Sequence, residues 1–473
     1  MLTSLLDPLP LAAASSELLP AREQMALTLG FHIIFASLGI AFPAYMLIAN
    51  YRGLRRNDPD ALELARRWSK VAAVTFAVGA VTGTVISFEF GLLWPEFTAR
   101  FGDVFGVAFA IEGIFFFLEA IFIGIYLFGW KRLSPWAHFW SGVPIVICGV
   151  GGALSVLAVN SWMNQPQGFT LSRGLLRGAE VTSVDPLKVI FNPALAYEAP
   201  HMILAGYMLT GFLIASVYAV GMLRGRRDRR HRLGLLIPLT VALVATPVQF
   251  LVGDTAARSV AADQPVKFAA MECVQETHTH VTEYLGGRCT EEGVKGGIGI
   301  PNLDSWLVGF SADTEVVGLD SVPPEDRPPA NTLLHLAFDA MVGICCALLA
   351  LGAWFAFVWW RRRDIPRTKW FLRAVAISGV AVGVAIECGW IVTEVGRQPW
   401  IVYEVMRTEE AVTGASGIWF TLAGVVVLYA GLGTATVLVL RSMARRWREA
   451  GDAAEESGGP YEPPAPVATG GER

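Results

Sequence analysis

The sequence contains about nine separate runs of 20 or more mostly apolar residues, and this pattern restricts the fold more than any other feature. Each run is long enough to cross the hydrocarbon core of a bilayer as a helix, because a helix advances ~1.5 Å per residue. Only 16% of the residues are charged, whereas soluble domains carry roughly 25%. We therefore predict an all-α, polytopic membrane protein. Its nine transmembrane helices are expected near residues 24–50, 70–94, 105–129, 137–162, 193–222, 233–252, 332–360, 371–395 and 415–440.

The distribution of Lys and Arg predicts the orientation in the membrane. Basic residues are concentrated in connectors that fall on one side of a nine-helix arrangement. These are residues 51–70, Lys131 and Arg132, residues 223–232, residues 361–369, and the run from Arg441 to Arg448. Since cytoplasmic loops carry the excess of Lys and Arg, the N-terminus is expected outside and the C-terminus in the cytoplasm.

These helices and connectors divide the chain into four expected parts. Residues 1–252 hold helices one to six, and residues 253–331 form a long extracytoplasmic loop. Residues 332–445 hold helices seven to nine. Residues 446–473 are polar and rich in Pro and Gly, which predicts a disordered cytoplasmic tail. Loops as long as 253–331 are usually functional.

Several ionisable side chains lie inside the apolar runs. Each costs at least a few kcal/mol there, so each is a functional hypothesis. They are His32, Glu89, Glu112, Glu119, His201, Asp339, Glu387 and Glu394. Neither a Walker-type loop, a dinucleotide fingerprint nor a basic patch for nucleic acid occurs in the sequence.

His201 and Met341 are expected at the same depth, about 12–14 Å below the outer surface, on different helices. A His and a Met in such positions suit a six-coordinate haem iron that transfers electrons. The alternative is that His201 is a hydrogen-bonded histidine of the bundle and that Met341 is ordinary packing, since apolar helices use Met freely.

His32 and Glu394 are also expected in the outer half of the bilayer, where they could bind metal. For Glu394 the alternative is an ion pair with Arg397, three residues later on the same helix.

Glu112 and Glu119 are seven residues apart in one apolar run. Seven helical steps bring them to the same face, about 10 Å apart. Two carboxylates stacked in this way suit a proton relay. The alternative is that each accepts or donates a hydrogen bond and only holds helices together.

At this point the chain resembles a known family, subunit I of the cytochrome bd-type quinol oxidases, from residue 32 to about residue 440. The resemblance rests on motifs in a fixed order. They are Gly30-Phe31-His32, Gly102-Asp103, Ala110-Ile111-Glu112-Gly113, Leu118-Glu119, Asn160-Ser161-Trp162-Met163, His201 with Ala205-Gly206-Tyr207, Gly253-Asp254, Lys267-Phe268-Ala269-Ala270-Met271-Glu272, Phe338-Asp339-Ala340-Met341-Val342, and the run from Glu387-Cys388-Gly389-Trp390 to Glu394-Val395-Gly396-Arg397-Gln398-Pro399-Trp400.

The resemblance implies three haems. His201 and Met341 are similar to the axial ligands of a low-spin haem b. His32 and Glu394 are similar to the ligands of two high-spin haems, of which one is a haem b and the other is haem d or a further haem b. Which of these two residues binds which haem stays open.

The resemblance also implies a catalytic cycle. Lys267 and Glu272 in the long loop are similar to the quinol-binding pair, and Trp390 and Arg397 to residues that line the high-spin haems. Quinol would be oxidised outside and O2 reduced to water with cytoplasmic protons.

In the same way, Glu112 and Glu119 are similar to the carboxylates of the family's proton path. The implied partners are subunit II in a membrane heterodimer, a possible small single-helix subunit, quinol and O2, with no nucleic acid. The implied location is the bacterial cytoplasmic membrane.

One spacing and two residues differ from those of better-known members. Glu112 and Glu119 are seven rather than eight residues apart, Glu89 stands where those members have Gln, and Asp339 stands where they have Arg. The loop at 253–331 also resembles the shorter of the forms that this loop takes in the family. Together, these differences indicate a divergent branch of the family.

Two cysteines, Cys273 and Cys289, lie in the loop expected outside, where a disulfide is allowed. Two other classes of function remain possible from sequence alone. One is a b-haem membrane subunit that transfers electrons without reducing O2, and the other is a proton-coupled transporter without haem.

Overall fold

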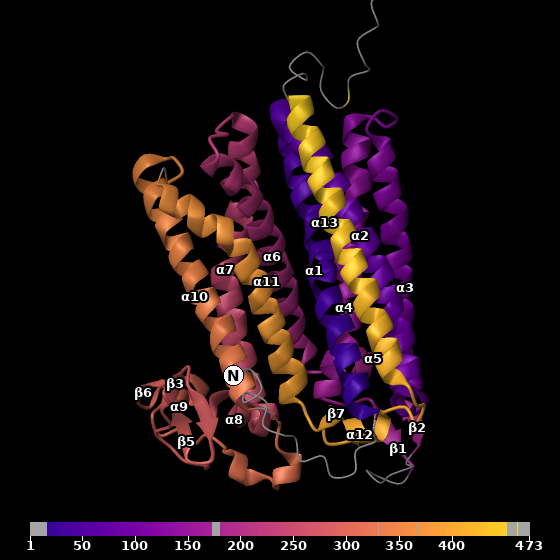
Figure 1. The fold of residues 1–473 in the computed structure, drawn as a ribbon, viewed down its shortest axis with the longest axis vertical. Coiled ribbons are helices and arrows are strands. Elements are labelled where there is room, and N and C mark those ends of the chain that lie inside the picture. Colours follow the sequence, from indigo (N-terminus) through magenta and orange to yellow (C-terminus); the bar gives the residue numbers. More distant parts are fainter. Residues whose placement is uncertain (1–16, 173–179, 330, 367, 452–460, 462–473) are drawn as a thin grey trace, which may run out of the picture.

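A computed structural model describes residues 17–172, 180–329, 331–366, 368–451 and 461. Within them, nine helices are long and apolar enough to cross a membrane, which confirms the predicted fold class (Figure 1). They are α1 (Leu18–Arg56), α2 (Pro59–Leu93), α3 (Pro95–Gly129), α4 (Pro135–Asn164), α6 (Leu195–Leu223), α7 (Arg229–Asp263), α10 (Asn331–Arg362), α11 (Lys369–Gly396) and α13 (Ile418–Gly451).

Many of these helices are longer than their apolar runs. Helix α7 reaches Asp263, past the expected end at 252, and α13 reaches Gly451, past the expected start of the tail at 446. The hydropathy of a segment reports the part that lies in hydrocarbon, whereas local signals set where a helix begins and ends. Pro59 and Pro95 occupy the first helical positions of α2 and α3, a position that suits proline.

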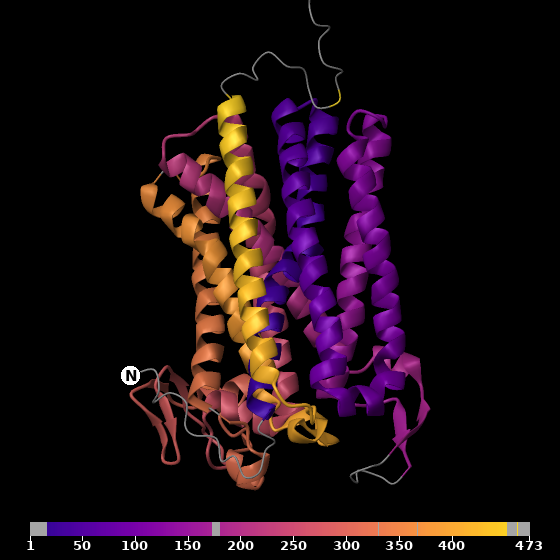
Figure 2. The ribbon, with the colours of Figure 1, turned by 45° about the vertical axis from the view of Figure 1, so that its right-hand side comes forward.

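The helices pack as two groups of four, and α13 packs against one of these groups. Helix α1 packs on α2, and α3 on α4, while α6 packs on α7 and α11, and α10 on α11. The groups meet where α6 contacts α1 and α4. Helix α13 lies along α1 and α2, as the two views show (Figures 1 and 2).

Short elements gather at one end of the bundle. Between α7 and α10 lies a lobe of small helices and strands, and two hairpins lie at the same end of the bundle (Figure 1). The lobe contains α8 (Pro265–Glu272), β3 (Glu283–Leu285), β4 (Arg288–Thr290), β5 (Gly293–Lys295), β6 (Ile298–Ile300), α9 (Leu303–Gly309), η1 (Leu319–Ser321) and η2 (Pro324–Asp326). The other short elements are β1 (Phe169–Leu171), β2 (Val181–Val184), α5 (Pro186–Ile190), β7 (Trp400–Val402), β8 (Met406–Arg407) and α12 (Thr408–Ala411).

The lobe is attached to the bundle by apolar contacts. Buried Phe268 and Met271 of α8 share a core with Leu334 of α10 and Val392 of α11.

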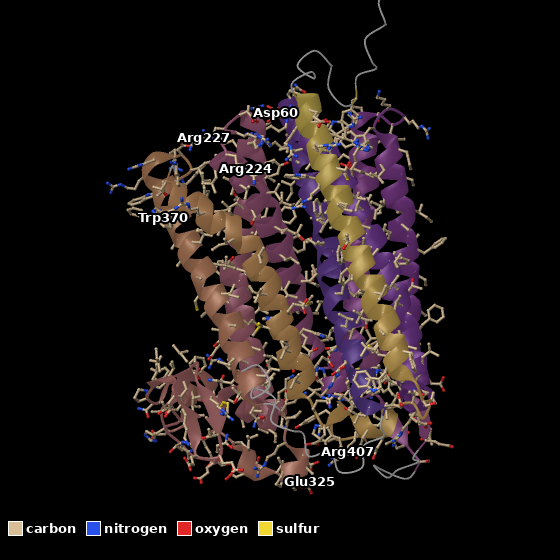
Figure 3. The ribbon with its side chains drawn as sticks, in the orientation of Figure 1. Asp60, Arg224, Arg227, Glu325, Trp370 and Arg407 are labelled. Carbon is tan, nitrogen blue, oxygen red and sulfur yellow. A yellow bond between two sulfur atoms is a disulfide. The ribbon has the colours of Figure 1, made fainter. Side chains whose placement is uncertain are left out.

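The basic connectors of the described chain lie at the end of the bundle opposite the lobe, where Figure 3 labels Arg224 and Arg227. At the lobe end, Arg407 pairs with Asp326. The charge asymmetry on which the predicted orientation rests is therefore present in the fold.

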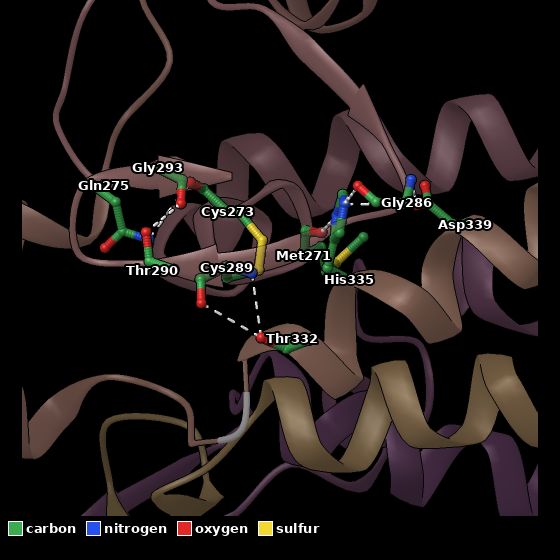
Figure 4. The surroundings of a disulfide bond; sticks show 10 residues. All are labelled: Met271, Cys273, Gln275, Gly286, Cys289, Thr290, Gly293, Thr332, His335 and Asp339. Atoms are coloured by element: carbon green, nitrogen blue, oxygen red, sulfur yellow. Dashed lines mark hydrogen bonds and ion pairs between the residues drawn. A yellow bond between two sulfur atoms is a disulfide. The ribbon is translucent and has the colours of Figure 1, made fainter. Parts of the chain in front are cut away.

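Cys273 and Cys289 form a disulfide within the lobe (Figure 4), as the sequence allowed. The bond joins the end of α8 to β4, and the backbone N–H of Cys289 also donates to Thr332 Oγ1 of α10 at 3.2 Å. The disulfide thus closes the segment 273–289 into a loop, and the hydrogen bond holds that loop against α10.

We predict that Cys289→Ser destabilises the lobe by about 3 kcal/mol, because the closed loop spans a sequence separation of 16 residues. Hydrogen exchange of the amides between residues 273 and 289 measures this change. Cys346→Ser, at an exposed position of α10, is the matched control and should leave the exchange rates unchanged. Peptide mapping without reductant that finds both loop thiols free would contradict the prediction.

Candidate functional site

His32 is held in a position to bind a metal through one ring nitrogen. Its Nδ1 lies 2.8 Å from Oγ1 of Thr82 on α2. That hydroxyl donates its own proton to the backbone carbonyls of Val78 and Gly79, at 3.0 and 3.1 Å, so it accepts the Nδ1 proton. The lone pair of the imidazole is then on Nε2. A second hydrogen bond that fixes the tautomer in this way is typical of metal-binding histidines.

A cavity of about 480 Å³ opens beside this part of α1. Glu387 of α11 lines it opposite a wall of small and apolar residues. That wall consists of Ala26, Leu27, Gly30, Phe31, Ile34 and Phe35. A side chain at Gly30 would meet Oε2 of Glu387 at 3.2 Å, so the glycine keeps this space open.

His201 and Met341 lie in the other group of helices. His201 is on α6 beside α7, where Gln249 Nε2 lies 3.3 Å from its Nδ1 and Gly253 faces its ring. Met341 is on α10, and a Cβ at Gly389 of α11 would lie 3.0 Å from its Sδ. The ring of His201 and the sulfur of Met341 thus each lie next to a glycine of the neighbouring helix.

Glu394 and Arg397 form the ion pair that the sequence allowed as an alternative. Arg397 Nη2 lies 2.6 Å from Glu394 Oε2, and Asn160 Nδ2 of α4 donates to Oε1 at 3.1 Å. Arg397 is only 3% exposed. Its Nε and Nη1 are buried and have no hydrogen-bond partner among the described residues. Two unpaired N–H donors on a buried cation suit a further anionic group such as a haem propionate. Trp390 lies one helical turn before Glu394.

Two further charges join this pair, and the sequence had identified only one of them. The charges acting on buried Lys267 of α8 are those of Glu198, Arg397 and Glu394. Burial is the largest cause that lowers the pKa of Lys267, to about 8, and Arg397 acts in the same direction. Glu198 of α6 accepts a hydrogen bond from Asn164 at 2.8 Å. Its place three residues before His201, inside an apolar run, was the signal that could have identified it.

Glu112 and Glu119 lie on α3 as predicted, with Glu119 buried. Glu119 faces α4, because a Cβ at Gly149 would lie 3.5 Å from its Oε1. That oxygen has no hydrogen-bond partner within the described chain, so the side chain is not bonded in the way that a purely structural carboxylate would be.

A polar cluster at the basic end continues the same face of α3. Tyr126 is a further seven residues along, and Asn50 Nδ2 donates to its hydroxyl at 2.8 Å. His138 Nε2 lies 2.8 Å from the Tyr126 carbonyl, and its Nδ1 lies 2.8 Å from the Tyr461 hydroxyl. The sequence reasoning missed this cluster, although the repeated spacing of seven residues was visible.

Lys267 and Glu272, expected as a pair, point to different groups. Whereas Lys267 faces the Glu394 cluster, Glu272 joins two other carboxylates, Glu283 and Asp304, in the lobe. The ligand oxygens of these three lie within 4.8 Å of one another. Neither Glu283 nor Asp304 had been identified from the sequence.

Asp339 and Glu89, two of the unusual positions, are both engaged in hydrogen bonds. Asp339 Oδ2 accepts from the backbone N–H of Gly286 at 2.5 Å and lies 3.5 Å from His335 Nε2 (Figure 4). Asp339 therefore connects α10 to the lobe through hydrogen bonding. Glu89 accepts from Gln24 at 2.8 Å and lies 2.6 Å from the Thr28 hydroxyl.

Comparisons with known proteins agree with this arrangement. The family model "Cytochrome bd terminal oxidase subunit I" matches residues 20–447. The chain is 34% identical to a putative cytochrome bd menaquinol oxidase subunit I of Bacillus subtilis, a match that covers 90% of this chain and 96% of the relative. It is 28% identical to the cytochrome bd-II ubiquinol oxidase subunit 1 of Escherichia coli, covering 90% and 96%.

The solved structure of the bd oxidase from Geobacillus thermodenitrificans matches with a TM-score of 0.84 and 36% identity, covering 92% of this chain and 99% of that one. These matches exclude the transporter and the simple electron carrier that the sequence had left open. The chain belongs to the cytochrome bd oxidase subunit I family, the haem-containing, multi-pass membrane subunits of bacterial terminal oxidases that oxidise quinol and reduce O2.

Proposed function

We propose that this chain binds three haems in the half of the membrane next to the lobe, oxidises quinol at the lobe, and draws protons for water from the basic end. The observation that carries the proposal is a set of side chains with free groups that could bind a haem iron or a haem propionate. These are His32 with Nε2 free, and Arg397 with two buried donors unpaired. When bound, the haems supply electron transfer and the binding and reduction of O2.

For the low-spin haem b, we propose His201 and Met341 as ligands. The supporting observation is that each side chain packs against a glycine of the neighbouring helix, His201 against Gly253 and Met341 against Gly389. An axial Met together with an axial His gives a six-coordinate iron of raised potential, suited to electron transfer.

For the two high-spin haems, we propose His32 and Glu394 as ligands. One of these haems is a haem b and the other is haem d or a further haem b. Arg397 would anchor a propionate while it pairs with Glu394, and Trp390 would exclude water from the same region. The Thr82 hydroxyl would keep the imidazole of His32 in the required tautomer.

The orientation follows from the charge asymmetry. With the basic end in the cytoplasm, the lobe lies outside and the N-terminus is on the outer side. Quinol would then bind near Lys267 and Glu272 and release its protons outside. The lobe as a quinol-binding unit is part of this proposal; it begins after Asp263 rather than at the expected residue 253, because α7 continues that far.

Protons for water would enter through the Tyr126 cluster and reach Glu119 before Glu112. The supporting observation is that Glu112, Glu119 and Tyr126 share one face of α3, at intervals of about 10 Å. Glu119, with an oxygen that lacks a partner, is able to exchange its proton.

We further propose that the chain works in a heterodimer with subunit II, to which a small single-helix subunit is added in some assemblies. The names of the relatives, which number this subunit as the first, support a second subunit.

The decisive measurement is a reduced-minus-oxidised absorption spectrum of the purified complex. We expect one low-spin and two high-spin haem signals, and the band of haem d tells whether it is present. A spectrum with a single low-spin haem would contradict the assignment of His32 and Glu394.

We predict that Met341→Leu removes the sulfur ligand while it keeps the volume. The low-spin signal should shift to a lower potential or become high-spin, with both high-spin signals retained, as redox titration followed by absorbance measures. Met208→Leu, a buried methionine of α6, is the matched control and should leave all signals unchanged. An unaltered low-spin spectrum in both Met341→Leu and His201→Ala would rule out these ligands.

We predict that Glu119→Gln lowers the rate of O2 consumption by on the order of 10²-fold, because Gln keeps the size of the side chain and cannot carry a proton. Reduction of the low-spin haem by quinol, followed by stopped-flow absorbance, should persist. Glu112→Gln should act in the same direction. Glu96→Gln, at an exposed position of α3, is the control. Normal turnover in Glu119→Gln and Glu112→Gln would show that these carboxylates only hold helices together.

A further inference from the structure

The lobe contains a buried group of three carboxylates for which quinol binding alone gives no reason. Glu272 ends α8, Glu283 begins β3 and Asp304 lies in the first turn of α9. They are 4%, 6% and 0% exposed. One oxygen from each lies within 4.8 Å of the others. Three segments far apart along the lobe therefore bring their acids to one point.

These carboxylates are prepared to hold or receive protons. Glu272 Oε2, Glu283 Oε2 and both oxygens of Asp304 are buried and have no hydrogen-bond partner within the described chain. Three ionised carboxylates at this separation, out of contact with water, would repel one another strongly, so the group shares protons. Asp304, fully buried with both oxygens unpaired, is directed into the group rather than toward solvent.

The surroundings add charges from the other elements that pack here. Asp339 of α10 acts on both Glu272 and Glu283, and His335 of α10 acts on Glu283. His335 is itself held by the Met271 carbonyl, 2.8 Å from its Nδ1 (Figure 4). Burial and the neighbouring acids raise the pKa of Glu272 well above its usual value.

The pKa values of Glu283 and Asp304 are raised as well. Burial is the largest cause that raises the pKa of Glu283 and that of Asp304, the latter to about 9. The paired strands β3 and β6 and helix α9 form the part of the lobe beside α8 in Figure 1, and β6 and part of α9 are exposed. The group thus lies between the helix that carries Lys267 and the outer surface.

We propose that Glu283 and Asp304, together with Glu272, are the proton acceptor of quinol oxidation. The proposal rests on quinol binding beside Lys267 and Glu272. Quinol loses two electrons, which go to the iron centres of the oxidase, and two hydroxyl protons. As each O–H bond breaks, its proton passes to the member of the group that is ionised at that moment, and the group gives up a proton before the next transfer. Release to the outer water restores the group, and the quinone leaves.

The test measures kcat/KM for quinol against pH in the purified heterodimer. An acceptor must be ionised, so the rate is lost as pH falls through the apparent pKa of the group. Asp304→Asn and Glu283→Gln remove one acid and its repulsion, so the acid limb should move down by about one pH unit. The maximal rate should fall at least tenfold, as expected when a proton acceptor is lost.

Controls separate this role from a structural one. Asp313→Asn and Glu292→Gln change exposed acids of the same lobe, 86% and 79% exposed at the side chain, and should leave the profile unchanged. O2 consumption driven by a one-electron donor that carries no proton should keep its rate in all four variants. The infrared carbonyl band of protonated carboxyl groups should lose intensity in Asp304→Asn.

Three results would overturn the inference. One is an unchanged acid limb and rate in both Asp304→Asn and Glu283→Gln. Another, which needs no variant, is an acid limb that the unmodified enzyme shows equally with quinol and with the proton-free donor. The third is a stoichiometric divalent cation other than iron, found by elemental analysis and absent from Asp304→Asn. Failure of the unmodified heterodimer to oxidise quinol would instead contradict the proposed function.

Discussion

The hydrocarbon interior of a membrane offers no hydrogen-bond partner to the chain, and the rest of the structure follows from this. The backbone must satisfy itself, so every spanning segment is a helix. Polar side chains must find partners within the bundle, as Gln24 and Thr28 do for Glu89. Against that background, polar atoms left unpaired are informative. Glu119 Oε1 and two nitrogens of Arg397 are such atoms, and both residues belong to the proposed catalytic machinery.

The number and type of the helices could be predicted because a membrane helix needs a long apolar run, which is a property of one segment alone. Helix ends could not, because they depend on local signals outside the hydrocarbon. The lobe illustrates a further limit. Its strands are three residues long, and β3 pairs with β6 although β4 and β5 lie between them in the chain, an arrangement that no periodicity reveals.

Some residues of the candidate site could likewise be predicted from the sequence, and others could not. His32, Glu394 and Glu119 stand out in the sequence because an ionisable residue in an apolar run is conspicuous. Their partners do not, since the Thr82 hydroxyl that orients His32 is 50 residues away. Likewise, nothing local distinguishes Asp304 from the other acids of the lobe, and only the fold brings it to Glu272.

The position of the disulfide has a consequence for the biogenesis of the protein. Cys273 and Cys289 both belong to the single segment between α7 and α10. In the proposed orientation, the bond can therefore form as soon as this segment reaches the oxidising outer side, before α10, α11 and α13 are inserted. A bond between two different connectors would have to wait for later helices, and would fix any error in their order. Here the oxidative step and the insertion of the last three helices are independent events.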